Sequence, residues 1–110
     1  MAYNSHRLTS PGSSKIKIDF ELDLSQIRAR YPNCTFIMRT AYFAPWNMSP
    51  CRVDVTVNDQ KLQNAAEVPG ENHGRTTHDS RFNPKDKNEL EVKFVSGNGV
   101  LFLWYFELLI

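Results

Sequence analysis

The sequence has only two cysteines and no long apolar run, and these shortages exclude several classes of protein. Two cysteines among 110 residues cannot form the several bridges of a disulfide-stabilised domain, so we expect Cys34 and Cys51 to be free thiols. No apolar run approaches the roughly 18 residues needed to span a membrane, which argues against membrane insertion. The formal net charge of +1 argues against a nucleic-acid partner.

The N-terminal residues contain no apolar segment of the kind found in secretory signals. We therefore expect a cytoplasmic protein, or one that is secreted by an unconventional route. Residues 1–14 are polar and without periodicity, and we predict that they form a flexible arm. Residues 15–110 are then predicted to form a single domain, because their length suits one hydrophobic core.

The motifs of several common enzyme classes are also absent. The sequence has no Gly-x-Ser-x-Gly, phosphate-binding loop or Cys-x-x-Cys motif, so we predict that the protein is not an enzyme. Three residues carry side chains suited to zinc, namely Cys51, His73 and His78. A structural zinc ion needs four ligands, and we predict no metal site. We expect no cofactor, but a structural calcium ion is left open, with Asp19, Glu21 and Glu107 as candidate ligands.

What the sequence does contain is alternation of apolar and polar residues, the pattern of β-strands with one buried face. Residues 15–24 alternate most cleanly. Further strand-like runs lie at residues 34–43, 51–58, 88–95 and 100–110. Residues 25–32 break the alternation and predict one helical turn with Ser25 as its N-cap. Residues 63–87 show no such pattern and predict a long irregular region.

The last run is the most apolar part of the chain. One of its faces carries Phe102, Trp104, Phe106, Leu108 and Ile110. This bulk predicts a central strand, and the preceding Ser96-Gly97-Asn98-Gly99 predicts a hairpin with the run before it. The opposite face carries Leu101, Leu103, Tyr105 and Leu109. A second apolar face favours a homo-oligomer that buries this surface of the sheet.

Five strong strands, one helical turn and no long helix indicate an all-β protein. Because the strands are short and alternate, they favour an antiparallel two-sheet sandwich of the jelly-roll type.

The second half of the chain, residues 51–110, also resembles the galactose-binding-like jelly rolls. The resemblance rests on Val-x-Val-Asn at residues 55–58, a long loop with Phe82, Asn-x-Leu-x-Val at residues 88–92, and a final strand that ends in Glu107-Leu108. The chain departs from the family at Asn58-Asp59, where the family usually has Asn-Gly. Such domains occur as carbohydrate-binding modules and as accessory domains of glycosidases. The resemblance therefore implies a jelly roll and suggests a saccharide ligand.

Sugar binding requires an aromatic ring that stacks on the sugar and planar polar groups that bond to its hydroxyls. The candidate residues of these types are Arg39, Tyr42, Trp46, Arg52, Asn58, Asp59, His73, Arg75, His78 and Arg81. They cannot all form one site, because residues 44–50 and 58–60 should lie at opposite ends of a sandwich. We consider two placements: Trp46 with the 70–81 loop, or a concave sheet face with Arg39 and Arg52.

These observations lead to two hypotheses of function. The first is a non-catalytic, lectin-like carbohydrate-binding module, in which oligomerisation raises avidity for a saccharide. The alternative is an intracellular β-sandwich that binds protein as an interaction or assembly domain.

Overall fold

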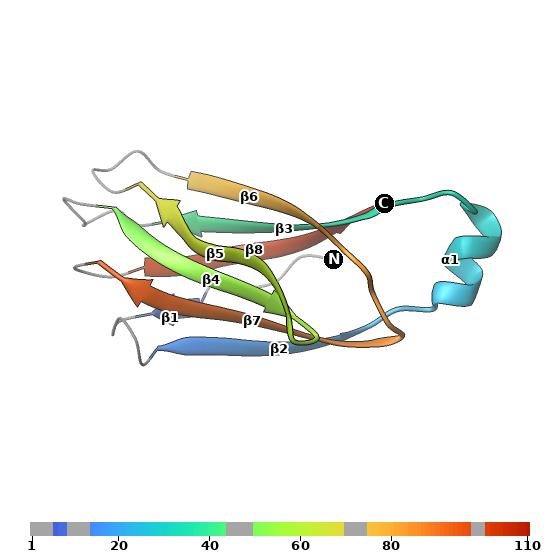
Figure 1. The fold of residues 1–110 in the computed structure, drawn as a ribbon, viewed down its shortest axis with the longest axis horizontal. Coiled ribbons are helices and arrows are strands. Elements are labelled where there is room, and N and C mark those ends of the chain that lie inside the picture. The colour runs from blue at the N-terminus through green and yellow to red at the C-terminus, as the bar shows by residue number, and fades with distance from the viewer. Residues whose placement is uncertain (1–5, 9–13, 44–49, 70–74, 98–100) are drawn as a thin grey trace.

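The computed structural model describes residues 6–8, 14–43, 50–69, 75–97 and 101–110, and their eight strands form two facing antiparallel sheets (Figure 1). The first sheet has the spatial order β1 (His6–Leu8), β8 (Leu101–Leu109), β3 (Phe36–Phe43) and β6 (Arg75–Phe82). The second has the order β2 (Lys15–Glu21), β7 (Lys87–Ser96), β4 (Cys51–Val57) and β5 (Gln60–Val68). This strand order is that of an eight-stranded jelly roll. The predicted all-β jelly-roll sandwich is therefore confirmed.

The core lies between the two sheets and follows the predicted alternation. Its largest fully buried side chains are Tyr42, Phe94, Phe106, Met38, Leu90 and Leu103. On β2, Ile16 and Phe20 are buried whereas Lys15, Lys17 and Asp19 are exposed. The strands β2, β4 and β7 thus each contribute one apolar face to the core and leave the other toward solvent.

The inner strand β8 changes the face that it buries halfway along its length. Ala41 pairs with Tyr105 whereas Tyr42 pairs with Leu103, so β8 carries one extra residue at this point. Leu103 and Phe106 are therefore both buried. The prediction of one continuous apolar face was wrong, because a bulge residue shifts the two-residue period of a strand. The predicted oligomer face includes Leu101 and Tyr105, whose side chains lie outside the described part, and it stays a prediction.

The predicted hairpin between β7 and β8 was wrong, because the two strands lie in different sheets. β7 pairs with β2 and β4, whereas β8 pairs with β1 and β3. Gly97, just after β7, has a φ of +127°, and a Cβ atom there would lie 2.9 Å from the Cα atom of Cys51. This glycine therefore allows a close backbone approach where the chain leaves the second sheet.

The region predicted to be irregular contains most of the edge strand β5 and all of the edge strand β6. Their inward polar side chains bond across the sandwich: Gln63 donates to the hydroxyl of Ser80, and Nε2 of His78 lies 2.9 Å from the carbonyl oxygen of Glu67. At Ala65, β5 has a positive φ of 50°, where its pairing with β4 shifts register. Polar inward residues and a bulge removed the apolar alternation on which the prediction relied.

Three residues of the predicted arm form β1, which pairs with Leu101–Leu103 of β8. This strand is defined by its backbone pairing with β8. A strand of three residues is too short to show an alternating side-chain pattern in the sequence. The other residues of the predicted arm, except Ser14, lie outside the described part. The division into an arm and a domain stays a prediction.

The helix α1 (Leu24–Arg30) joins β2 of one sheet to β3 of the other, beyond one end of the sandwich (Figure 1). Its N-cap is Asp23 instead of Ser25, since Oδ1 of Asp23 accepts hydrogen bonds from the Gln26 amide at 3.2 Å and the Ser25 hydroxyl at 2.9 Å. No helix of the described residues has the length and apolar character needed to cross a membrane. Cys34 and Cys51 are free thiols, as predicted.

Candidate functional site

The two arginines predicted to share a concave sheet face lie on opposite outer surfaces. Arg39 is on β3 of the first sheet and Arg52 is on β4 of the second, and their chain neighbours Met38 and Val53 fill the core. The Arg39 guanidinium donates two hydrogen bonds to the Asp79 carboxylate, at 2.8 and 2.9 Å. Arg52 donates to the Ala65 carbonyl oxygen at 3.0 Å. The structure therefore does not support a joint site of Arg39 and Arg52.

Tyr42 and His78 lie inside the sandwich, near its β5–β6 edge. Tyr42 is 0% exposed, burial raises its pKa, and its ring centroid lies 5.1 Å from that of His78. Nε2 of His78 contacts the Glu67 carbonyl oxygen. The Tyr42 hydroxyl and Nδ1 of His78 have no hydrogen-bond partner within the described residues. Neither ring can stack on a saccharide from this position.

Three further candidates cannot be placed as side chains. Trp46 and His73 are outside the described residues, and the side chain of Arg75 is also outside them. The flanking strand ends can be placed, since Phe43 pairs with Arg75 and Cys51 pairs with Val68 at the same end of the sandwich (Figure 1). A site of Trp46 with the 70–81 loop stays a prediction, although residues 75–81 of that loop belong to β6.

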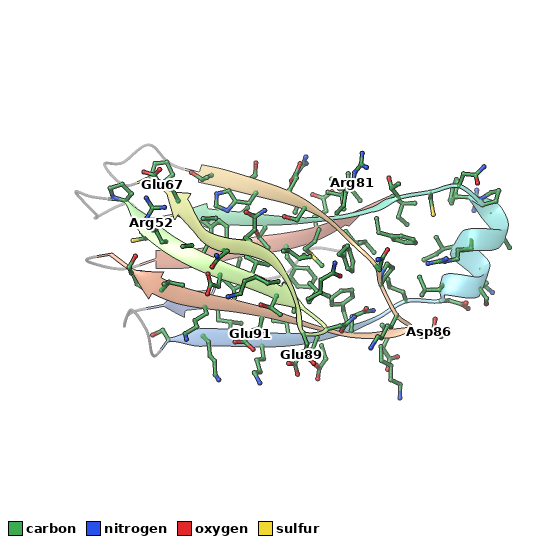
Figure 2. The ribbon with its side chains drawn as sticks, in the orientation of Figure 1. Arg52, Glu67, Arg81, Asp86, Glu89 and Glu91 are labelled. Atoms are coloured by element: carbon green, nitrogen blue, oxygen red, sulfur yellow. The ribbon has the colours of Figure 1, made fainter. Side chains whose placement is uncertain are left out.

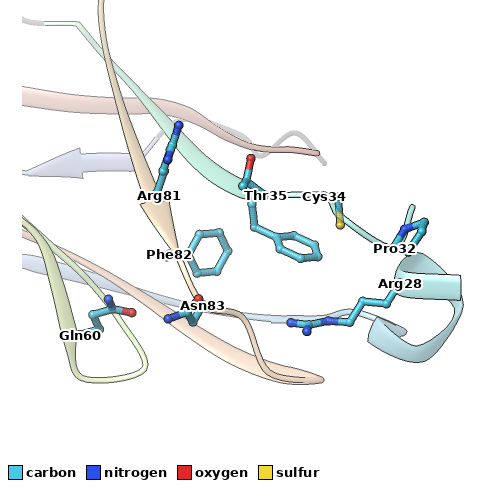
Figure 3. Close-up of a pocket in the computed structure, with 9 residues that line it drawn as sticks. Arg28, Pro32, Cys34, Thr35, Gln60, Arg81, Phe82 and Asn83 are labelled. Atoms are coloured by element: carbon cyan, nitrogen blue, oxygen red, sulfur yellow. The ribbon is translucent and has the colours of Figure 1, made fainter. Parts of the chain in front are cut away.

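A groove that the sequence did not indicate lies between α1 and the sandwich (Figure 3). Its first hollow, of about 390 Å³, is lined by Arg28, Pro32, Cys34, Thr35, Phe36, Gln60, Arg81, Phe82 and Asn83. A second, shallower hollow of about 740 Å³ adjoins it along residues 32–35 and adds Arg30, Tyr31, Asn33 and Ile110. We call the two hollows together the α1 groove. The first hollow has the size of a small-molecule site, for which roughly 300–1,000 Å³ is typical.

The floor of the α1 groove is a pair of phenylalanines on neighbouring strands. Phe36 of β3 is paired in register with Phe82 of β6, and their rings meet edge to face with centroids 6.5 Å apart. The guanidinium carbon of Arg28 lies 5.9 Å from the centroid of the Phe36 ring, a cation–π distance. This contact places the guanidinium of Arg28, which remains an exposed residue, beside the groove floor.

One wall of the groove is the segment that links α1 to β3. The Tyr31 amide donates to the Ile27 carbonyl oxygen at 2.8 Å, and the Tyr31 carbonyl oxygen accepts from the Cys34 amide at 3.2 Å. The Tyr31 side chain remains 49% exposed and lines the second hollow. A hydrogen-bonded backbone thus presents a half-exposed aromatic ring, and the guanidinium carbon of Arg30 lies 5.6 Å from its centroid.

The facing wall follows β6 and is held in place by Asn88. Oδ1 of Asn88 accepts from the Lys85 amide at 2.8 Å, and its Nδ2 donates to the Lys85 carbonyl oxygen at 2.6 Å. The Asp86 carbonyl oxygen accepts from the Leu22 amide at 2.8 Å. These bonds tie the segment after Asn83 to the chain that enters α1, so both walls are anchored.

The groove is basic. Arg28, Arg30 and Arg81 line it, and the linings of its two hollows include no Asp or Glu side chain. None of these three arginines forms an ion pair with a carboxylate of the described residues, whose ion pairs are Lys17–Glu89, Lys17–Glu91, Arg39–Asp79 and Lys61–Asp54. Figure 2 shows Arg81 on β6 away from Arg52 and Glu67, which lie toward the other end.

Sequence reasoning missed this site because its two walls are far apart in the chain. Residues 28–35 contain two arginines, a tyrosine and an asparagine without an acid, and residues 81–83 contain an arginine and an asparagine. This excess of basic over acidic residues could have indicated a basic surface. The pairing of Phe36 with Phe82, which joins the two segments, was hidden because β6 was not predicted.

The ligands considered for calcium do not meet. Asp19 lies on β2 of the second sheet, on its outer face, and Glu107 lies on β8 of the first sheet. Among the residues that the structure describes, no three His, Cys, Asp or Glu side chains gather to hold a metal ion. These residues therefore do not fit a calcium site.

Comparison of the sequence with family models and with curated proteins gives no match. Two solved structures share the fold across nearly the whole chain. One is a carbohydrate-binding module, CBM36, in complex with calcium and xylotriose, with a TM-score of 0.63 and 10% identity over 94% of this chain and 78% of that chain. The other is a family 35 carbohydrate-binding module from Clostridium thermocellum, with a TM-score of 0.60 and 10% identity over 98% of this chain and 89% of that one. At this identity the similarity establishes the fold: the chain is a jelly roll of the kind found in carbohydrate-binding modules.

Proposed function

We propose that the protein is a non-catalytic carbohydrate-binding module and that the α1 groove holds the saccharide. The observation that carries the proposal is the groove itself: an exposed tyrosine beside amide side chains and beside arginines that have no carboxylate partner among the described residues, on a fold shared with two carbohydrate-binding modules. The CBM36 structure was solved with xylotriose, which supports a saccharide as the class of ligand here.

The side chains of the groove suit the chemistry of sugar binding. Tyr31 offers a ring face for the C–H face of a pyranose. The Thr35, Gln60 and Asn83 side chains make no hydrogen bond to the described part of the chain, so their polar atoms are available to sugar hydroxyls. No Asp or Glu side chain of the described residues lines the groove, which supports binding without hydrolysis, since glycosidases generally use a pair of such side chains.

A glycan array with the protein presented multivalently tests the proposal, because weak single sites are detected through avidity. We expect reproducible binding to one saccharide class, competed by the free sugar. A blank array with folded protein would contradict the proposal, and a pull-down for a protein partner would then test the interaction-domain alternative.

Variants locate the site on the molecule. Tyr31→Ala should weaken binding, whereas Arg39→Gln should not, because Arg39 lies on the outer sheet face and bonds Asp79. If Trp46→Ala abolishes binding while Tyr31→Ala leaves it intact, the saccharide binds at the other end of the sandwich.

A further inference from the structure

The charge of the α1 groove narrows the ligand class, and this inference rests on the proposed function. Two of the arginines in its lining, Arg28 and Arg81, come from separate elements and flank the first hollow (Figure 3). Arg28 belongs to the last turn of α1, and Arg81 is the penultimate residue of β6. Within the described residues neither forms a salt bridge.

Helix electrostatics explain only part of this arrangement. Basic residues in the last turn of a helix are favourable near its negative end, which accounts for Arg28 and Arg30 without any ligand. Arg81 is on a strand and gains nothing from the helix. Its place in the lining of the same hollow is therefore a separate observation, and Figure 3 shows its side chain extending away from that of Arg28.

Arginines elsewhere on the surface behave differently. Arg39 has a carboxylate partner in Asp79, with two short hydrogen bonds, and Arg52 bonds a carbonyl oxygen. Two acids that contact the start of α1 are also committed: Asp23 caps the helix, and Oδ1 of Asp86 accepts from the Leu24 amide at 3.3 Å. The guanidinium groups of Arg28 and Arg81 thus lack the hydrogen-bond partners within the described residues that Arg39 and Arg52 have.

We propose that the α1 groove selects acidic saccharides, those that carry a carboxylate or a sulfate, with Arg28 and Arg81 as the anion-binding groups. A guanidinium binds a carboxylate or sulfate through two parallel charge-assisted hydrogen bonds. The neutral side chains Thr35, Gln60 and Asn83 bond to the hydroxyls of the same ligand, which distinguishes an acidic sugar from a bare anion.

Calorimetric titration of the full chain with matched oligosaccharides tests this. A uronate oligosaccharide is compared with its carboxyl-reduced, neutral counterpart, and a sulfated oligosaccharide with its desulfated form. We expect each acidic form to bind at least about tenfold more tightly than its neutral partner, since charge-assisted hydrogen bonds contribute about twice as much as neutral ones. The preferred pair shows whether carboxylate or sulfate is the recognised group.

Matched variants assign the effect to the groove. Arg28→Gln and Arg81→Gln should each remove most of the preference for the acidic form and keep the affinity for the neutral form, whereas Arg39→Gln should change neither. Equal affinity for acidic and neutral forms would overturn the inference and leave carbohydrate binding standing. If the wild-type chain binds neither the acidic nor the neutral forms, both the inference and the proposed function are wrong.

A non-saccharide anion completes the test. Inorganic sulfate and a single-stranded oligonucleotide of matched charge should bind far more weakly than the acidic oligosaccharide. If either binds as tightly, the groove is a general anion site and the inference is wrong.

Discussion

The hydrogen bonds around Asn88 and the α1 groove are neighbouring polar regions that differ in one respect. The polar groups around Asn88 bond to one another, whereas several of those in the groove have no partner among the described residues. Asn88 is buried, and its side chain bonds the backbone of Lys85 and Nδ2 of Asn58. Asn83, close to it in the chain, is exposed in the groove and has no such bonds within the described residues. Polar groups of the first kind stabilise the fold, whereas those of the second kind are available to a ligand.

The largest effect should come from Asn88→Ala. The substitution removes three hydrogen bonds of a buried side chain and takes the partner from the Lys85 amide and carbonyl groups, so the free energy of unfolding should fall by about 3 kcal/mol. Urea denaturation measures the loss. Asn83→Ala is the matched control and should change the free energy of unfolding by less than about 0.5 kcal/mol. If both variants lose a similar free energy of unfolding, the polar groups of the groove stabilise the fold as much as those around Asn88, and the comparison is wrong.

A smaller effect is expected for Tyr31→Ala, and it should appear in binding alone. Removing an exposed stacking ring should lower saccharide affinity by roughly 3- to 10-fold, and the melting temperature should stay within about 2 °C of the wild type. Tyr31→Phe keeps the ring and should retain most of the affinity. Unfolding of Tyr31→Ala would instead make the tyrosine part of the core.

The smallest effect concerns the satisfied arginine, Arg39. Its hydrogen bonds hold the pKa of Asp79 below the ordinary value for an aspartate. The pair therefore stabilises the fold above the unfolded-state pKa of roughly 3.9 and loses this contribution as the pH falls through the lower folded-state pKa.

Because Arg39 and Asp79 are partly exposed, Arg39→Gln should cost less than about 1 kcal/mol at pH 7. The cost should vanish at strongly acidic pH, and Arg28→Gln should show no such pH dependence of stability. Urea denaturation across the acidic range measures both. A pH-independent cost for Arg39→Gln would show that the ion pair is not its cause.

The sequence was sufficient to predict the sheets but not their connections. Alternation identified β2, β4 and β7 because each buries one apolar face. It failed for β5 and β6, whose inward polar residues bond across the sandwich edge, and for β8, where a bulge reverses the buried face. The turn residues around Gly97 predicted a hairpin between β7 and β8, because the sequence does not show which strands pair with each other.

The site was less predictable than the fold. Residue type alone selected Arg39, Arg52, Tyr42 and His78, and the structure shows each of them already bonded or buried. Whether an arginine is free for a ligand depends on which carboxylates tertiary structure brings to it. Arg28 and Arg81 could be recognised as available only after the pairing of β3 with β6 was known.

The most direct test of the central claim is to map the binding site by NMR, with labelled protein titrated with the oligosaccharide that binds best. A saccharide in the α1 groove should shift the backbone amide signals of residues 28–35 and 81–83 most strongly. If those signals stay unchanged while the signals of Phe43, Cys51 and Arg75 shift, the saccharide binds at the opposite end of the sandwich and the α1 groove is not the site.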